Sequence, residues 1–575
     1  MKILGIADGM TAGVALIENG RIIFAAHEER LIREKMATGF PRQSISKVFE
    51  VTHTKPEEVD AVAVATINEF FADPAVGYDG WLLREQTPFK EVILNISSTM
   101  SPILGGWPLF KQSYYNIKSL LTRRRRKEIA HLLRRDWELE CPIRFIDHHY
   151  AHACSAYFTS GLVEATVITM DGAGDHSSSH IYVVKDGHFQ KLWNLDSFDS
   201  IGNYYAYITH ICGFKAQKHE GKITGLAAYG QPIYTDILKQ FTAYDKGSIR
   251  NTGKVYYWSA VRAIERALPK PFKREDLASS MQEILEEEVC AYAQYWTEKT
   301  RCGDLALAGG VFANVKLNQR IHELENVRSI FIHPGMGDEG LAVGAALGLY
   351  YEMAPSPQAI SGGYRLKNVY FGPCYSDNEI KAEIDAAGLE AEYINDIEVR
   401  IAKLLSEGFV VGRFDGGMEY GPRALGNRSI LYQATDPTVN DWLNKNLKRT
   451  EFMPFAPVTL KEFEDQCYEN MDGARYPAKF MTITFDCTPW MKKTCPAVVH
   501  VDGSARPQII EREVNPSYYK IVDEYRKITG LPTIINTSFN MHEEPIVCTP
   551  FDSIRSFKMG HLDYLAIGHF LLKNT

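Results

Sequence analysis

The sequence lacks the features that mark secreted, membrane-spanning and disulfide-stabilised proteins. No apolar run reaches the length of a membrane span, and the chain opens with MKILGI rather than with a signal-peptide layout. Its ten cysteines are scattered and include no CxxC pair, which disfavours a cysteine-based zinc site and favours reduced, mostly buried thiols. We therefore expect a cytoplasmic protein with no membrane attachment.

An excess of positive charge is also missing. The chain carries 63 Lys and Arg against 71 Asp and Glu, a net charge of −8, which disfavours a general nucleic-acid binder but leaves room for local basic pockets. Apolar residues make up 45% of the sequence and charged residues 23%, as in ordinary globular proteins. Because 575 residues exceed what one hydrophobic core usually holds, we expect at least two domains.

Alternating strand and helix patterns predict an α/β fold. The turn-forming pair Asn19-Gly20 joins two predicted strands into a hairpin. Strands are predicted at 2–8, 12–18, 21–26, 61–65, 143–146, 165–170, 304–308, 329–333 and 409–412. Helices are predicted at 42–50, 148–158, 339–350 and 377–387.

Composition also suggests where the domains divide. The segment 353–365 is rich in Pro, Ser and Gly, so we place the first domain at 1–354 and the second at 366–575. Residues 66–125 are rich in aromatics, Pro and Gly and are interpreted as an insertion. The basic run at 123–127 is interpreted as a solvated helix face, with contact to an anionic substrate as the alternative.

Three glycine-containing segments each follow an apolar strand: DGMT at 8–11, DGAG at 171–174 and GGV at 309–311. Glycine lets backbone amides close on a phosphate, and an aspartate at a strand end can reach a metal held by that phosphate. Taken together and in this order, the segments resemble the two phosphate loops and the adenosine loop of the actin/sugar-kinase ATPase superfamily.

A pair of histidines indicates a metal site. His148 and His152 are four residues apart in a predicted helix, so both imidazoles lie on one face. Asp171 and Asp338 are the natural oxygen ligands to complete the set. Two imidazoles and two carboxylates suit iron, zinc or manganese, and the sequence does not choose among them. The neighbouring Asp147 and His149 are interpreted as supporting or structural residues.

The segment 412–429 (GRFDGGMEYGPRALGNRS) is the most distinctive motif of the second domain. It places five glycines and three arginines in eighteen residues. Arginine forks and exposed backbone amides favour a phosphate-rich ligand, with an ordinary surface loop as the alternative. A phosphate-rich ligand carries several negative charges, so several fixed cations are needed to hold it. The candidates are Arg423, Arg428, Lys448 and Arg506.

Five first-domain motifs resemble the NodU/CmcH carbamoyltransferase family: DHHYAHA at 147–153, DGAGD at 171–175, KHEGKITGLAAYG at 218–230, GGVFAN at 309–314 and GMGDEGLAVGAAL at 335–347. The 412–429 motif, with 500–508 and 536–540, resembles the family's YrdC-like carbamoyl-adenylating domain. The resemblance covers nearly the whole chain except the insertion. It implies an actin/sugar-kinase-like first domain, similar to the ATPase that transfers threonylcarbamoyl groups onto tRNA.

The resemblance implies an O-carbamoyltransferase that uses carbamoyl phosphate and Mg-ATP to form carbamoyladenylate. It then passes the carbamoyl group to a hydroxyl of a small acceptor, a natural product, with Fe or Zn at the His and Asp site. The implied catalytic residues are Asp8, Lys35, Arg423, Lys448 and Arg506. The implied nucleotide and substrate contacts are Gly9, Thr11, Asp171, Gly172, Gly174, Glu220, Lys222, Gly309, Gly310, Asn314, Gly421, Arg428, Ser429, Ser538 and Asn540. The implied metal ligands are His148, His152, Asp171 and Asp338.

The chain also departs from the family pattern. Met10 stands where many members carry a histidine associated with transfer, so Asp8 or a nearby histidine is left as the base. Other departures are Thr224, Thr450, Met453 and His542. Two other functions stay open: a carbamoyl-transfer enzyme acting on tRNA or protein, and a nucleotide-binding regulatory protein. We expect the acceptor pocket in the 66–125 insertion and a homodimer as the assembly.

Overall fold

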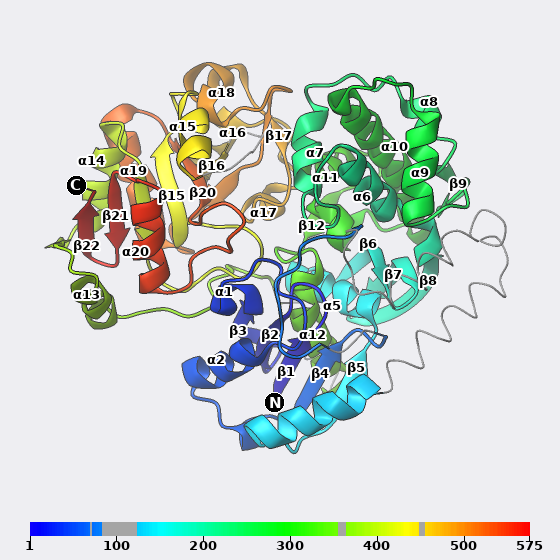
Figure 1. Ribbon diagram of the computed structural model, residues 1–575, viewed down its shortest axis with the longest axis horizontal. Helices are drawn as coiled ribbons and strands as arrows, with labels where there is room; N and C mark the ends of the chain where they lie inside the picture. The colour runs from blue at the N-terminus through cyan, green and yellow to red at the C-terminus, as the bar shows by residue number, and fades with distance from the viewer. Residues whose placement is uncertain (69–71, 83–123, 355–363, 448–454, 575) are drawn as a thin grey trace. The chain divides into compact units, whose positions relative to one another are not determined.

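The computed structural model describes residues 1–68, 72–82, 124–354, 364–447 and 455–574 (Figure 1). The chain forms two compact units. The first holds Met1–Ile22 and Met36–Arg365, and the second holds Ile23–Lys35 and Leu366–Thr575. The division at 365/366 lies at the end of the Pro-, Ser- and Gly-rich segment, but residues 23–35 join the second unit, unlike the single division inferred from composition.

The first sheet of the first unit has the strand order β3-β2-β1-β4-β5, and its edge strand β3 runs on into residues 23–35, which belong to the second unit. Its strands are β1 (Lys2–Ala7), β2 (Gly13–Glu18), β3 (Arg21–His27), β4 (Ala61–Ala65) and β5 (Ile143–Ile146). β1 pairs antiparallel with β2 and parallel with β4, and β4 pairs parallel with β5. The β2–β3 turn is the predicted Asn19-Gly20 pair, and both residues have positive φ, 51° and 78°.

The second sheet of this unit repeats the same plan later in the chain. Its order is β12-β11-β6-β7-β8, formed by β6 (Glu164–Gly174), β7 (Ser177–Lys185), β8 (His188–Asp196), β11 (Asp304–Ala308) and β12 (Ser329–Ile332). β6, β7 and β8 pair antiparallel, whereas β11 pairs parallel with both β6 and β12. Each sheet is thus a three-stranded meander extended by two parallel strands, the arrangement expected of an actin/sugar-kinase-like domain.

Two helices made largely of small residues connect the two sheets. α12 (Leu341–Met353) packs on β1, β2 and β4, and α5 (His148–Ser160) packs on β6 and β11. The two helices also pack on each other (Figure 1). Glycine permits this closeness: a Cβ on Gly5 would lie 2.0 Å from the carbonyl oxygen of Ala342, and one on Gly344 would lie 1.8 Å from that of Ala151.

The remaining described elements of the first unit surround these sheets. The helices are α2 (Arg42–Thr52), α6 (Ile201–Ile211), α7 (Glu220–Ala227), α8 (Thr235–Leu238), α9 (Trp258–Ala267), α10 (Arg274–Thr300) and α11 (Val315–His322), with 3-10 turns η1 (Pro56–Glu58), η2 (Ser197–Asp199), η3 (Gly310–Ala313) and η4 (Asp338–Gly340). A small hairpin joins β9 (Ala243–Asp245) to β10 (Ser248–Arg250). A further helix covers 124–137. Most of the predicted insertion, 83–123, lies outside the described residues.

The second unit contains a mixed eight-stranded sheet of order β13-β22-β21-β14-β15-β20-β16-β19. The strands are β13 (Glu392–Tyr393), β14 (Val411–Phe414), β15 (Arg428–Gln433), β16 (Ala456–Leu460), β19 (Gln508–Ile510), β20 (Thr533–Ser538), β21 (Tyr564–Ile567) and β22 (Phe570–Lys573). Only the β14–β21 and β16–β19 pairs run parallel. The strand predicted at 409–412 begins two residues later than expected, at Val411. Between β16 and β19 in the sequence, β17 (Phe485–Asp486) and β18 (Ser504–Ala505) form a separate two-stranded sheet.

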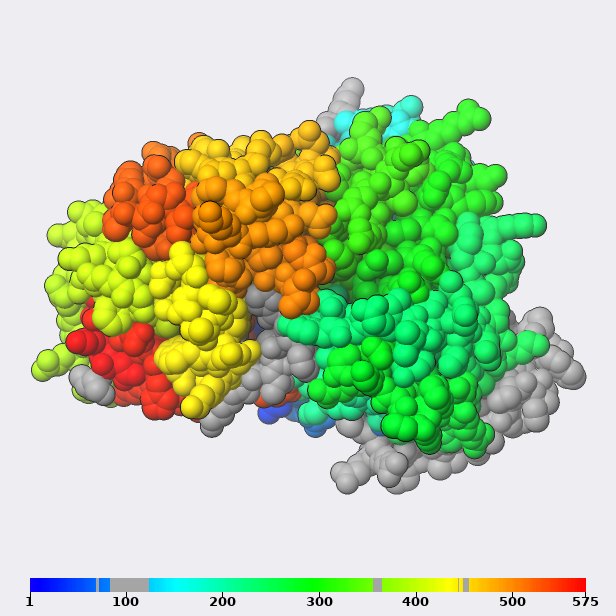
Figure 2. All heavy atoms as spheres, turned by 90° about the horizontal axis from the view of Figure 1, so that it is seen from above, coloured from blue at the N-terminus to red at the C-terminus, as the bar shows by residue number. Residues whose placement is uncertain are grey.

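Helices complete the second unit. α14 (Ile397–Ser406) and α19 (Pro516–Thr529) pack together over a core that includes Val411, Leu431 and Ile534 from three sheet strands. The others are α1 (Glu28–Ile32), α13 (Asp377–Ala386), α15 (Val439–Asn446), α16 (Glu464–Cys467), α17 (Arg475–Ala478), α18 (Pro489–Thr494) and α20 (Pro550–Met559), with η6 (Lys461–Phe463) and η7 (Pro496–Val498). In Figure 2 the yellow and orange segments of this unit, which include α15 to α18, are visible beside its lime-green and red segments.

Both units are α/β, as predicted from the sequence. Among the helices that the structure describes, none has both the length and the apolar character required to cross a lipid bilayer.

Candidate functional site

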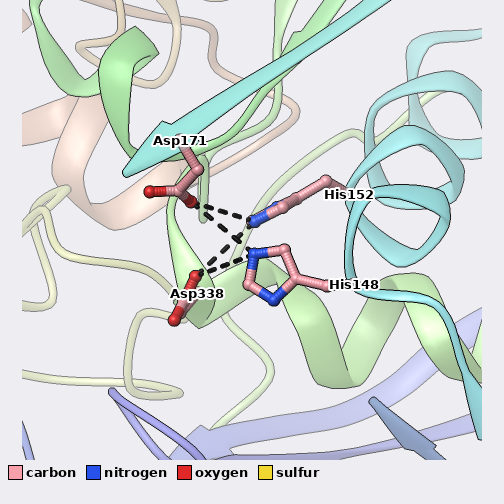
Figure 3. Close-up of side chains that lie close together, drawn as sticks. All are labelled: His148, His152, Asp171 and Asp338. Carbon is pink, nitrogen blue, oxygen red and sulfur yellow. Dashed lines mark ion pairs between the residues drawn. The ribbon is translucent and has the colours of Figure 1, made fainter. Parts of the chain in front are cut away.

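Four side chains from three segments of the first unit converge on one point (Figure 3). His148 and His152 project from the first turns of α5, which Asp147 caps by accepting a hydrogen bond from the Tyr150 amide at 2.8 Å. Asp171 lies in β6 where the pairing with β7 shifts register between Met170 and Gly174. Such an irregularity redirects a side chain out of the regular alternation of a strand.

The fourth residue, Asp338, opens η4. Nε2 of His152 lies 3.3 Å from Oδ2 of Asp171 and 3.5 Å from Oδ1 of Asp338. Nε2 of His148 lies 3.6 Å from Oδ1 of Asp338 and 3.8 Å from Oδ2 of Asp171. Every donor atom of the cluster is within 4.8 Å of the others.

The cluster passes a geometric test for a metal ion. Donors about 2.1 Å from one tetrahedral ion lie about 3.4 Å from each other, close to the observed spacing of nitrogen and oxygen atoms. Within the described residues, Nε2 of His148 and Nε2 of His152 are buried and have no hydrogen-bond partner. Two imidazoles and two carboxylates are a donor set for Fe, Zn or Mn, so these residues fit a divalent metal.

The electrostatics of the cluster also favour a cation. Burial alone would lower the pKa of His148, but the carboxylates of Asp338 and Asp171 raise this pKa to about 9. Burial opposes ionisation of Asp171 as well, yet its interaction with the two imidazoles holds its pKa well below the usual range. The site is therefore built to stabilise positive charge between its carboxylates.

His149 is placed differently, although it lies beside a ligand in the sequence. Its Nδ1 is 2.9 Å from the Thr169 hydroxyl and its Nε2 is 3.1 Å from the carbonyl oxygen of Ser177. Burial and the neighbouring histidines lower its pKa well below the ordinary value. With both ring nitrogens engaged, His149 has the structural role that the sequence suggested.

The glycines near Asp171 require a correction to their predicted contacts with phosphate. A Cβ on Gly174 would lie 2.1 Å from the His148 ring, so this glycine makes room for a metal ligand. The amides of Gly172 and Gly310 both donate to the Asp171 carboxylate, at 2.6 and 3.1 Å. Gly309 has φ of 110° and donates its amide to the carbonyl of Met336. The amides of Gly172, Gly309 and Gly310 are thus occupied inside the protein rather than presented to a phosphate.

The first loop also differs from expectation. Asp8 is 1% exposed, and both of its carboxylate oxygens accept hydrogen bonds from Arg125, one of them at 2.8 Å. This ion pair stabilises the carboxylate and occupies the atoms that would take a proton, which argues against Asp8 as the transfer base. Thr11 has φ of 50°, and its hydroxyl donates to the carbonyl of Met10. Gly9 accepts a hydrogen bond from the Gly39 amide through its carbonyl.

Arg125 corrects the interpretation of the basic run as a solvated face. Arg124 and Arg126 are exposed, but Arg125 is 1% exposed and faces inward. A signal for this was present in the sequence: Ile129 and Leu132 follow Arg125 by four and seven residues, so all three share one face of the helix, and both apolar residues are buried.

The KHEGK segment forms the start of α7. Glu220 is its first residue and accepts a hydrogen bond from the amide of Gln217. Burial raises the pKa of Glu220 to about 7. Lys222 is half-buried, and its Nζ lies 5.9 Å from the centre of the Phe214 ring. Neither residue contributes to the metal cluster, and both remain candidates for contacts with a nucleotide.

Asn314 belongs to a buried polar network. It caps α11, and its amide nitrogen donates to Gln282 at 2.8 Å. The Tyr205 hydroxyl lies 2.8 Å from that of Thr224 and 2.9 Å from Oε1 of Gln282. Thr224, a departure from the family pattern, is therefore integrated into this network.

In the second unit, the arginine-rich motif is largely bonded to itself. Arg428 is fully buried and donates to the carbonyls of Asp415, Asn427, Pro373 and Gly416 at 2.7 to 3.3 Å. Its guanidinium lies 3.7 Å from the centre of the Phe414 ring, and burial lowers its pKa. Its predicted role as a phosphate-binding cation is corrected accordingly: Arg428 holds the loop together.

Other members of this motif are also occupied. Oε1 of Glu419 accepts the amides of Leu425, Asn427 and Arg428 at 2.8 to 3.1 Å. The Ser429 hydroxyl is buried and accepts the amide of Gly426, and the carbonyl of Gly421 accepts from Arg30 at 2.8 Å. These contacts explain the motif's shape without a ligand.

A separate recess in the second unit contains Arg506. It offers about 290 Å³ of space that includes open solvent. Its walls are formed by Phe455, Ala456, Thr484, Val498, His500, Ser504, Ala505 and Arg506. Arg506 and Arg423 are both half-buried, unlike Arg428. A cation beside a partly apolar wall suits an anionic or nucleotide ligand.

The remaining predicted residues of the second unit divide as follows. The Asn540 amide donates to the carbonyls of Met541 and Glu544 at 2.8 and 2.9 Å, so its donors hold a turn rather than await a carbamoyl group. Ser538 and Lys35 are half-buried. Lys448, with the departures Thr450 and Met453, lies outside the described residues.

Two family models match the chain, one for each part. The carbamoyltransferase N-terminus matches residues 2–347, and the carbamoyltransferase C-terminus matches residues 402–574. The chain belongs to the carbamoyltransferase family. As a family member it is an enzyme that transfers carbamoyl groups, in agreement with the resemblance seen in the sequence.

Relatives extend over nearly the whole chain. Nodulation protein NolNO of Sinorhizobium fredii is 32% identical, over 97% of this chain and 78% of its own length. The uncharacterized protein sll1178 of Synechocystis is 30% identical over 98% and 95%. Nodulation protein U of Sinorhizobium fredii is 26% identical over 94% of each chain. Among solved structures, nucleotide-bound HypF covers 62% of this chain and 47% of its own at 12% identity and a TM-score of 0.31, too low to support a conclusion.

Proposed function

We propose that this carbamoyltransferase uses ATP and carbamoyl phosphate to carbamoylate a hydroxyl of a small acceptor. Carbamoyl phosphate and water give carbamate and phosphate. Carbamate attacks the α-phosphate of ATP, forming carbamoyladenylate and releasing pyrophosphate. The acceptor oxygen then attacks the carbamoyl carbon, its proton leaves to a base, and AMP departs.

The observation that carries the proposal is the four-residue cluster in the first unit. The Nε2 atoms of its two imidazoles are buried without hydrogen bonds among the described residues and face two carboxylates. His148, His152, Asp171 and Asp338 would hold a divalent metal ion, Fe or Zn. When bound, such an ion supplies a Lewis acid for the oxygen chemistry of carbamoyl transfer.

The rest of the first unit provides positions for the nucleotide. Glu220 and Lys222 at the start of α7, with the buried network around Asn314, would contact the adenosine part of carbamoyladenylate. Because the pKa of Glu220 is near 7, this carboxyl can donate or accept a hydrogen bond at neutral pH. Asp8 is paired with Arg125 and would orient the first loop instead of acting as the base.

We assign adenylation to the second unit, where Arg506 lines the recess with His500 and Thr484. A guanidinium is a fixed cation that can make two parallel hydrogen bonds to phosphate oxygens. Arg423 and Lys448 complete the cationic set by resemblance. Arg428 is excluded from it, because its guanidinium donates to backbone carbonyls.

The acceptor class is proposed from the family resemblance seen in the sequence, and several relatives are named as nodulation proteins. We take the acceptor to be a small hydroxylated natural product. Cytoplasmic location, a homodimer and the absence of a nucleic-acid partner complete the proposal, with the charge of −8 supporting the last point.

The test separates the two half-reactions. With ATP and carbamoyl phosphate, the wild type is expected to release pyrophosphate, and with a pool of hydroxylated acceptors it should yield AMP and products 43 mass units heavier, roughly one carbamoyl group replacing hydrogen. Arg506→Ala should abolish pyrophosphate release, whereas Arg512→Ala, an arginine over the Tyr519 ring outside the recess, should not. His148→Ala should retain pyrophosphate release and lose transfer.

Equal loss of both half-reactions in His148→Ala would overturn this division of labour. If the wild type binds ATP but releases no pyrophosphate under any condition, a nucleotide-binding regulatory protein becomes the better description.

A further inference from the structure

Thr66 has a backbone conformation that must be held in place by its surroundings. It follows β4 directly, has φ of 68° and is 5% exposed. A β-branched residue at positive φ is sterically strained and persists only where neighbouring contacts enforce it. Such strain is often found next to functional sites, and here it lies next to the metal cluster.

Arg125 provides the first set of these contacts. Its guanidinium donates to the carbonyl of Thr66 at 2.7 Å and to that of Ala65 at 3.0 Å, in addition to both oxygens of Asp8. Asp8 follows β1, and Ala65 ends β4, the parallel neighbour of β1. One buried guanidinium thus joins the ends of two adjacent strands.

Asp175 provides the second set from the other side. Its two carboxylate oxygens accept the amides of Ile67 and Asn68 at 2.8 and 2.7 Å. The same carboxylate accepts the amide of His148, the first residue of α5, at 2.8 Å. The segment that contains Thr66 is therefore fastened to the start of the helix that carries both histidine ligands.

The Thr66 side chain contacts a metal ligand directly. Its hydroxyl oxygen lies 3.1 Å from Nδ1 of His148, while Nε2 of the same ring faces Asp171 and Asp338. An imidazole that ligates through Nε2 carries its proton on Nδ1, and the acceptor of that proton fixes the tautomer and the angle of the ring. Nδ1 of His152, by contrast, is buried without a hydrogen-bond partner in the described chain.

We infer that Thr66 is a positioning residue for the metal site, that its hydroxyl sets the tautomer and orientation of His148, and that Arg125 and Asp175 hold it there. The inference rests on the metal site of the proposed function. It also gives the Asp8–Arg125 pair a role: through Thr66, the first loop and the metal ligand share one buried guanidinium.

The experiment measures Co²⁺ binding to the metal-free full-length protein through the visible absorption of bound Co²⁺. Thr66→Val should weaken Co²⁺ affinity about 10- to 100-fold and alter the spectrum, because the ring loses its hydrogen-bond acceptor. Thr66→Ser should restore both. Thr169→Val is the matched control, because it removes a threonine–histidine hydrogen bond of the same kind from His149, which is not a ligand. Its Co²⁺ affinity should equal that of the wild type.

Arg125→Met should also weaken Co²⁺ binding although Arg125 contacts no ligand, and the Thr66→Val/Arg125→Met double variant should lose little more than Thr66→Val alone. If Thr66→Val proves unfolded, Thr66→Ala against Thr66→Ser makes the same comparison. Wild-type affinity in Thr66→Val, or equal loss in Thr66→Ser, overturns this inference and leaves the metal site standing. Failure of the wild type to bind Co²⁺ overturns both.

Discussion

The two units present their charged motifs in opposite ways. In the first unit, imidazole nitrogens and carboxylate oxygens converge at 3.3 to 3.8 Å, and the two Nε2 atoms have no hydrogen bonds among the described residues. In the second unit, Arg428 is equally buried, but it donates to four backbone carbonyls. In the part of the chain that the structure describes, the first arrangement leaves the Nε2 atoms of both imidazoles without a partner, whereas in the second only Nε of the Arg428 guanidinium lacks one and its two terminal nitrogens are bonded.

The difference teaches how to distinguish a binding residue from a supporting one within a motif. Burial and charge do not separate the two, since His152 and Arg428 are both fully buried. The deciding property is whether the polar atoms are already bonded inside the protein, because a buried polar atom needs a partner. Arg506 differs from Arg428 in its position, because it lies in the wall of a recess that a ligand can enter.

The largest expected effect tests the four-residue cluster of the first unit. Asp171→Ala removes one of four ligands, so metal binding should be lost and carbamoyl transfer should fall by at least about 1000-fold, since catalytic groups that act as a unit cost this much when one is removed. Pyrophosphate release should persist. Metal content and AMP formation are the measurements, and Asp245→Ala, an exposed carboxylate of the same unit, is the control.

A second prediction tests the hydrogen bonds of Arg428 in the second unit. Arg428→Met leaves four backbone carbonyls without their donor, two of them in buried hydrogen bonds, which should lower the free energy of unfolding of the second unit by about 3–5 kcal/mol. Chemical denaturation measures this effect. Arg512→Met, which loses only contact with the Tyr519 ring, should cost less than about 1 kcal/mol. A stable Arg428→Met protein that no longer releases pyrophosphate would return Arg428 to the substrate-binding set.

A third prediction concerns the space next to His148. In Gly174→Ala the new Cβ would lie 2.1 Å from the imidazole, so the ring must move and metal affinity should fall about 10- to 100-fold. Gly221→Ala is the control, because no atom lies within 4 Å of its added Cβ. Isothermal titration with Zn²⁺ compares the two. Unchanged affinity in Gly174→Ala would show that the ligand cluster tolerates displacement of His148.

The smallest expected effect is a pH dependence of the stability of the first unit. Glu288 in α10 is 4% exposed, and burial raises its pKa to about 7. The folded state therefore keeps a proton that the unfolded state loses, and the stability of the first unit should decrease as pH rises from about 4.5 to about 7. We expect a change of about 1–2 kcal/mol, reduced from the full shift by relaxation around the site.

Glu288→Gln should remove this part of the pH dependence. Thermal unfolding of wild type and variant at pH 5 and pH 7.5, run side by side, measures the difference. Parallel pH dependence in the two proteins would mean that Glu288 ionises in the folded state as it does in the unfolded chain.

Features set by local spacing could be predicted from the sequence. The Asn19-Gly20 turn fixed the first hairpin, and His148 and His152 share a face because a helix repeats every 3.6 residues. Asp171 and Asp338 were predicted as the carboxylates of the same site, and the structure places both beside the two histidines. The repeated strand order also follows from short meanders and parallel crossovers, because elements that follow each other in the sequence usually lie side by side.

Features that depend on contacts between residues far apart in the sequence could not be predicted. Gly174 is needed because the His148 ring lies against it, and no sequence pattern shows that distance. Arg428 and Arg506 are the same residue type in neighbouring motifs, and only the positions of the surrounding carbonyls separate them. Arg125 could be predicted only in part. Its spacing from the apolar Ile129 and Leu132 places it on the buried face of the helix, but its partner Asp8 lies 117 residues away in the sequence.

The chain crosses between the units three times, because residues 23–35 leave the first unit to join the second and then return. Arg30 in this segment donates to the carbonyl of Gly421, and Arg33 donates to those of Pro545 and Ile546. After a protease cut within 353–365, the C-terminal part would therefore stay bound through its contacts with residues 23–35. Both ends of that short peptide remain covalently joined to the first unit. A fragment covering only 366–575 would lack α1, and recovering its fold would require that peptide to be supplied in trans.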